Sequence, residues 1–153
     1  MNRLITRLRR GEPEAGNAIV EFVYLAVLLM VPLVYLLITV FRVQSASYAV
    51  SSAAREAGRV YVTSETVDDA RSRALAAAGH VMADSNLPLR PDQLDITCSS
   101  TPCLQPGSRV NVVLTTSVAL PLVPRLFTDR APASVQVTSR HLEVVDRYRA
   151  AAR

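Results

Sequence analysis

The sequence predicts an α+β fold, in which a long N-terminal helix continues into a small head with a second helix and a three-stranded antiparallel sheet. Three observations predict it. The run from Phe22 to Phe41 is apolar and carries no formal charge, small apolar residues continue beyond it at helical spacing, and the apolar period changes to two after Pro88. At 153 residues, the chain has room for one such head beside the helix.

The apolar run has the length of a membrane-spanning helix. Its twenty residues, at a rise of about 1.5 Å each, cover the hydrocarbon core of a bilayer, which is about 30 Å thick. A cleavable signal peptide is the nearest alternative, with a weak cleavage site at Ser45-Ala46-Ser47. Its apolar stretch is usually shorter, about 7 to 15 residues. The run therefore favours a transmembrane segment.

Charge on the two sides of the run predicts its direction. Four arginines precede it, whereas only Arg42 follows closely. Because basic residues stay on the cytoplasmic side, we expect a cytoplasmic N-terminus and an extracytoplasmic C-terminal part. The four are Arg3, Arg7, Arg9 and Arg10.

The two cysteines agree with that direction. Cys98 and Cys103 lie in a loop rich in Ser, Thr and Pro. A disulfide between them would persist only in an oxidising compartment, such as the outside of the cytoplasmic membrane. We predict this disulfide, and the C-x-x-C spacing of redox and metal sites is absent.

The helical pattern beyond the membrane predicts one continuous helix. It should run from Asn17 to about Arg59, because Gly58 and the β-branched residues after it favour a helix end. The predicted organisation is therefore a basic cytoplasmic leader (1–16), a transmembrane and stalk helix (17–60) and an extracytoplasmic α+β head (61–153).

The head should begin with a short helix and continue as strands. Thr66, with Asp69 three residues later, resembles a capped helix start, and this helix should end near Asp84. Period-two segments then predict strands at 94–98, at 110–120 and from Val135 onward. We expect residues 147–153 to be frayed.

Composition argues against several classes of function. The formal net charge is +4, but the seventeen arginines are scattered and no aromatic residues interleave with them, so nucleic-acid binding is not expected. His80 and His141 are interpreted as surface residues, because no nucleophile pattern accompanies them. With no catalytic or metal-binding cluster, we predict a protein that is not an enzyme and needs no cofactor.

The most informative motif stands between the basic leader and the apolar run: Gly16-Asn17-Ala18-Ile19-Val20-Glu21-Phe22. It resembles the processing site of type IV pilin-like proteins. In those proteins an aspartyl prepilin peptidase cuts after the Gly on the cytoplasmic side, and a Glu stands fifth in the mature chain. Counted from Asn17, Glu21 is the fifth residue.

Within that superfamily, the first sixty residues resemble the TadE-like proteins of tight-adherence pilus systems. The resemblance implies a minor pilin or pseudopilin that is cleaved between Gly16 and Asn17, is held in the inner or cytoplasmic membrane and is then incorporated into the pilus. The residues that carry it are Ala18, Val20-Glu21-Phe22, Pro32 and Ala53-Ala54-Arg55-Glu56-Ala57-Gly58-Arg59.

The resemblance also implies partners and residue roles. The partners would be the lipid bilayer, the prepilin peptidase and other pilin or pseudopilin subunits, which would contact Glu21 and Phe22 on the N-terminal helix. The amine at Asn17 of a neighbouring subunit would neutralise Glu21, a charge that costs about 2.5 to 3.5 kcal/mol at a bilayer centre. The plainer alternatives are a linker at Gly16 and a Glu21 that only stabilises its own helix start.

Two other classes of protein remain open at this point. One is an uncleaved single-pass membrane protein with an extracytoplasmic binding domain. The other is a secreted enzyme released by signal peptidase, with a product that begins near Tyr48.

Overall fold

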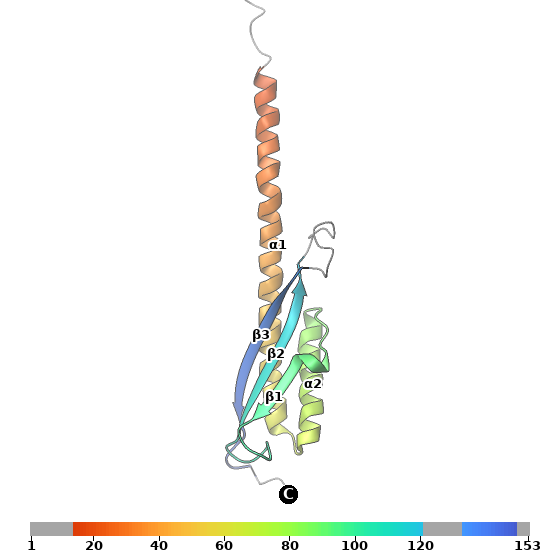
Figure 1. Ribbon diagram of the computed structural model, residues 1–153, viewed down its shortest axis with the longest axis vertical. Coiled ribbons are helices and arrows are strands. Elements are labelled where there is room, and N and C mark those ends of the chain that lie inside the picture. The colour runs from red at the N-terminus through yellow and green to blue at the C-terminus, as the bar shows by residue number, and fades with distance from the viewer. Residues whose placement is uncertain (1–13, 121–132, 150–153) are drawn as a thin grey trace, which may run out of the picture. The chain divides into compact units, whose positions relative to one another are not determined.

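The computed structural model describes residues 14–120 and 133–149, with the side chains of the first helix described from residue 18 onward. It has the predicted α+β layout (Figure 1). The predicted leader falls mostly in residues 1–13, outside the described part. The elements are α1 (Glu14–Thr63), α2 (Val67–Asp84), the 3₁₀ turn η1 (Pro91–Gln93), β1 (Leu94–Cys98), β2 (Arg109–Ala119) and β3 (Ser134–Val144).

Helix α1 is longer than predicted at both ends. It begins at Glu14, before the expected start at Asn17, and continues past Gly58 to Thr63. The chain divides into two compact units, residues 1–38 and 39–153, and α1 runs through both. The part of α1 from Thr39 onward therefore belongs to the same unit as the sheet.

The sheet has the strand order β1-β2-β3 and is antiparallel throughout. Its register pairs Leu94 with Leu114 and Val112 with His141. Burial alternates along β2, so one face of the strand is in the core and the other is more exposed, which confirms the period-two prediction. The buried β2 residues are Val110, Val112, Leu114, Thr116 and Val118.

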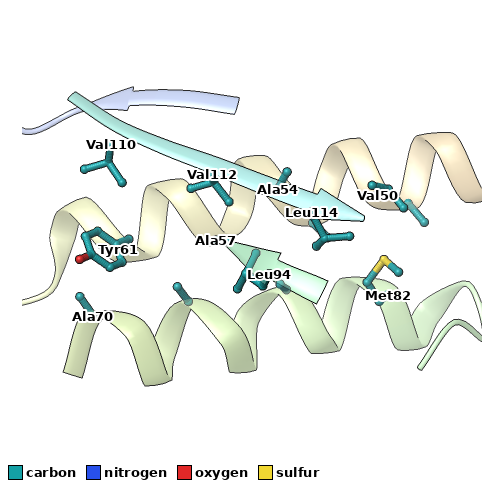
Figure 2. Close-up of a cluster of buried hydrophobic side chains, with 14 of the residues drawn as sticks. Val50, Ala54, Ala57, Tyr61, Ala70, Met82, Leu94, Val110, Val112 and Leu114 are labelled. Carbon is teal, nitrogen blue, oxygen red and sulfur yellow. The ribbon is translucent and has the colours of Figure 1, made fainter. Parts of the chain in front are cut away.

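Helices α1 and α2 contribute the other side of the core. In Figure 2, buried side chains of α1, α2, β1 and β2 gather in one cluster between the helices and the sheet. Ala70, Ala74, Ala78 and Met82 recur every four residues along α2 and are fully buried. Small side chains at these positions let the backbones approach closely, because the distance between packed elements depends on the side chains at the contact.

Both ends of α2 follow the sequence prediction. The hydroxyl of Thr66 accepts a hydrogen bond from the amide of Asp69 at 3.3 Å, so Thr66 is the N-cap. The helix ends at Asp84, and Asn86 takes a positive φ of 55°. The amide of Leu87 donates to the carbonyl of Met82 at 3.0 Å. This is the usual left-handed termination of a helix.

The C-terminal end of α1 is capped by a residue that lies far away in the sequence. The guanidinium of Arg149 donates to the carbonyl oxygens of Val62, at 2.6 Å, and Ser64. The last turn of α1 contains no basic residue, so Arg149 brings the cation that a helix C-terminus favours. The expectation that the chain is frayed from Arg147 onward is therefore wrong for Arg149, and residues 150–153 lie outside the described part.

Candidate functional site

The first unit of the chain presents an apolar helix surface that nothing in the described part of that unit covers. Side chains from Ala18 to Ile38 are exposed, apart from a half-exposed Tyr35. Leaving such a surface in water costs about 25 cal/mol for each Å² of apolar area, so it needs an apolar solvent or a partner. Helix α1 is long and apolar enough to cross a membrane.

The helix stays continuous through Pro32, in the middle of this apolar surface. A proline has no amide hydrogen, so the carbonyl of Leu28 loses its usual partner one turn earlier. Transmembrane helices tolerate this loss where neighbouring groups satisfy the free carbonyl. Pro32 is therefore compatible with a spanning helix.

The predicted processing site lies inside the first turn of α1. Because the helix begins at Glu14, the bond between Gly16 and Asn17 is helical, whereas we expected the helix to begin after Gly16. A protease needs this segment extended. Opening it is inexpensive, because the first turn contributes few intrahelical hydrogen bonds and Gly favours the helix by about 1 kcal/mol less than Ala.

Glu21 and Phe22 are consecutive residues of this helix. Both side chains are exposed, Phe22 by 72%. Among the described residues, Glu21 forms no ion pair. The backbone of Asn17 is one helical turn earlier, about 6 Å along the axis, so positions 17 and 21 share one face of α1.

The predicted disulfide forms at the end of the sheet where α1 ends. Cys98 and Cys103 are joined, with their Cα atoms 5.4 Å apart. The hydroxyl oxygen of Tyr61 in α1 lies 4.0 Å from the sulfur of Cys98, and Leu104 beside the bridge is buried. Burial raises the pKa of Tyr61, so this phenol stays protonated at neutral pH. The bridge and Tyr61 together close this end of the core.

Sequence reasoning missed a contact between α1 and β3. Nε2 of His141 lies 3.0 Å from a carboxylate oxygen of Glu143, and both side chains are half-buried. They pack over Gly58: a Cβ on that glycine would lie 2.9 Å from Cγ of Glu143 and 3.3 Å from Cδ2 of His141. His141 is therefore a partly exposed residue that also packs against α1, a contact that its interpretation as a surface residue did not include. The signal was the period-two spacing that places both residues on the face of Val137.

The part of the chain that the structure describes holds no group of three or more His, Cys, Asp or Glu residues suited to a metal ion. Three described features can therefore be related to function. They are the uncovered apolar surface of α1, the Gly16 to Glu21 motif at the start of that helix, and the head with its disulfide. No family model and no curated protein matches the sequence, and no solved structure matches the fold.

Proposed function

We propose that the protein is a TadE-like minor pilin or pseudopilin, cleaved by a prepilin peptidase after Gly16 and taking part in the assembly of a tight-adherence type IV pilus. One observation carries the proposal. The processing motif leads directly into an apolar helix surface that is uncovered within its own unit, from Ala18 to Ile38. A helix of this kind serves first as a membrane anchor and then, in an assembly, as a packing surface between subunits.

The orientation follows from the charges and the cysteines. With the arginine-rich leader in the cytoplasm, the head lies outside. The Cys98 to Cys103 bridge supports this side, because disulfides persist in oxidising compartments. The protein would remain in the inner or cytoplasmic membrane until it enters the pilus.

Glu21 has a defined task in this proposal. Cleavage creates an α-amino group at Asn17, which is positively charged near neutral pH. In the apolar surroundings of packed helices, the amine of one subunit and the carboxylate of Glu21 in its neighbour would neutralise each other. An unpaired charge in that environment is strongly unfavourable, so the pair would also set the relative height of the two helices.

One observation favours the second candidate, an uncleaved single-pass membrane protein with an extracytoplasmic binding domain. The bond after Gly16 lies within α1, so the peptidase has to open the first turn before it can cut. If that opening does not occur in the cell, the leader stays attached and the head acts as a membrane-tethered domain.

Intact-mass and N-terminal analysis of the protein, produced together with the prepilin peptidase, distinguishes the two candidates. We expect a product of 137 residues that begins at Asn17, which is 153 less the 16 of the leader. The variant Gly16→Leu should remain at full length in the membrane, because a bulky side chain at the scissile bond blocks cleavage.

The matched control is Gly11→Leu, which changes a second leader glycine away from the motif and should be processed like the unchanged protein. A 137-residue product from Gly16→Leu would refute the processing site. A mature N-terminus at Met1 in the unchanged protein would favour the uncleaved candidate.

A further inference from the structure

The sheet of the head has two edges that no further strand covers within the described ranges. They are β1 and β3, on either side of β2 (Figure 1). A free edge presents backbone N–H and C=O groups that can pair with another chain, and proteins usually protect such an edge with proline, lysine or a short strand. β3 is eleven residues long and contains neither proline nor lysine. It is therefore a long edge with little protection.

At the β1 edge, Ile96 presents backbone groups that β2 does not bind. In an antiparallel pair, residues that exchange hydrogen bonds with the partner strand alternate with residues whose N–H and C=O point away from it. The amide of Ser99 donates to the carbonyl of Arg109 at 2.9 Å, so Ser99 and every second residue before it pair with β2. The backbone groups of Ile96 therefore point to the free edge.

At the β3 edge, the same alternation selects Arg140 and Leu142. The amide of Val145 donates to the carbonyl of Ser108 at 2.8 Å, so Val145 and every second residue before it pair with β2. Arg140 and Leu142 lie between those residues, and their N–H and C=O point away from β2. Their side chains are exposed, Leu142 by 55%, whereas His141 between them packs over α1.

The membrane fixes how the edges of two copies can meet. β1 and β3 are both antiparallel to β2, so they run in one direction, along the part of α1 from Thr39 onward (Figure 1). Copies anchored in one membrane share an orientation, so β1 of one copy and β3 of a second would be parallel. In a parallel pair, the groups of Ile96 would bond to the residues on either side of the residue opposite. At equal height that residue is His141, whose neighbours are Arg140 and Leu142.

Side chains on both faces fit this parallel pair. On the outer face, Asp95 and Arg140 share one row of the register, so Asp95 of one copy would lie about 5 Å across from Arg140 of the second. Both are exposed, and neither forms an ion pair in the described part of the chain. On the inner face, a groove of about 270 Å³ lies between α2 and β1, with Leu75, Leu94 and Ile96 in its lining. A strand added to β1 would cover this groove.

We propose that β3 of one anchored copy pairs with β1 of the next, as a parallel strand that continues the sheet. Pairing β1 with β1, or β3 with β3, would not bring Asp95 and Arg140 together. Each copy keeps one edge free, so the contact is head-to-tail and can be extended. β1 has only five residues, so the contact depends on the membrane, which holds the copies at high effective concentration. The proposal rests on the membrane anchor of the proposed function and names a second copy of this chain as the partner of the head.

Disulfide trapping in membrane vesicles tests the pairing. Asp95→Cys and Arg140→Cys, combined in one chain, should give a ladder of crosslinked oligomers, whereas either single variant should stay monomeric. Within one sheet the two positions are two strands apart, about 9.6 Å, which is too far for a bridge, so a crosslink has to join two copies. The native cysteines are already joined to each other. The matched control combines Asp95→Cys with Gln136→Cys, on the same edge but about 13 Å along the strand from Arg140, and should give no ladder.

A charge exchange tests the chemistry of the contact. It is read through Thr97→Cys with Leu142→Cys, which the same register places opposite each other between copies. Adding Asp95→Arg should lower the trapped fraction by about fivefold, which corresponds to about 1 kcal/mol for one cross-strand charge pair. Adding Arg140→Asp as well should restore it. The control is Arg55→Asp, which changes an exposed arginine on α1 and should have no effect.

The remaining outcomes overturn the assignment. No ladder from the first double variant, in vesicles that retain the protein, would exclude the pairing and leave the anchor in place. Crosslinks from either single variant would mean that like edges meet, and equal trapping with Gln136→Cys would mean random collision. Flotation of the unchanged protein with the vesicles tests the anchor separately, so failure of the anchor is distinguishable from failure of the pairing.

Discussion

Glu21 carries a formal charge at the edge of a segment whose other residues, from Ala18 to Phe41, are uncharged. Its side chain is exposed, and it has no ion-pair partner among the residues that the structure describes. A carboxylate in this position makes membrane insertion less favourable, so its presence indicates that it contributes to a different step. In the proposed function, that step is the assembly of subunits.

The variant Glu21→Ala separates assembly from insertion. Insertion should be unchanged or easier, because a costly charge is gone. Cleavage after Gly16 should persist, whereas incorporation into the pilus should fall strongly, because the amine at Asn17 loses its counter-ion. Blots for the mature form, together with co-purification with pilus components, measure the two effects.

Glu21→Gln is the matched variant, since it keeps the shape and the hydrogen-bonding capacity of Glu21 but removes the charge. It should fail in assembly like Glu21→Ala. If a cleaved Glu21→Ala protein enters the pilus normally, Glu21 only supports its own helix start, a contribution of no more than about 1 kcal/mol.

At the scale of elements, the approach of α1 to β3 depends on the missing side chain of Gly58. Glycine inside a helix costs about 1 kcal/mol relative to alanine, so a reason is needed for its presence there. The reason is the position of Glu143 and His141 directly over it. At a second helical glycine, Gly79 in α2, a Cβ would meet no atom within 4 Å apart from its chain neighbours and the backbone of its own helix.

These two glycines predict opposite effects of the same substitution. Gly79→Ala should raise the free energy of unfolding of the head by about 0.5 to 1 kcal/mol, because it gains helix propensity without a clash. Gly58→Ala should lower it by about 1 kcal/mol, because overpacking costs about 1 to 3 kcal/mol and outweighs that gain. Thermal or urea unfolding of the two variants measures both.

A double variant with Gly58→Ala and Glu143→Ala identifies the source of the Gly58 effect. Removing the carboxylate side chain makes room for the new methyl group, so the added cost of Gly58→Ala should largely disappear in the Glu143→Ala background. An equal cost in both backgrounds would mean that the packing of β3 over α1 does not explain Gly58.

At the scale of the whole molecule, the head has one hydrophobic core. A disulfide and a set of hydrogen bonds stabilise the end of the head at which α1 stops. The Cys98 to Cys103 bridge lies against Tyr61, and Arg149 holds the carbonyl end of α1. Both contacts lie at the end of the head where α1 stops. The disulfide and Arg149 therefore stabilise the same end of the head.

Loss of the disulfide should destabilise the head without unfolding it. The bridge closes a short loop with four enclosed residues, for which chain entropy gives about 2 kcal/mol. Replacing both cysteines by serine should lower the free energy of unfolding by about this amount, and reductant should have the same effect on the unchanged protein but none on the double variant. Quantitative thiol labelling of both cysteines in the unreduced native protein would exclude the bridge.

The sequence alone determined the features that depend on periodic patterns or on residues close together in the chain. The charge-free run up to Phe41, the cap at Thr66 and the alternation along β2 are periodic or short-range patterns, and the helices and strands formed where those patterns lie. The cysteine pair could be predicted for the same reason, since its two members are close in the chain.

The tertiary structure decided what depends on residues far apart in the chain. Gly58 indicates a helix end by local propensity, yet α1 continues to Thr63 because packing under β3 outweighs that propensity. The carbonyl oxygens at the end of α1 accept hydrogen bonds from Arg149, which lies far away in the sequence. No periodicity records such contacts, because they exist only once the sheet lies against the helices.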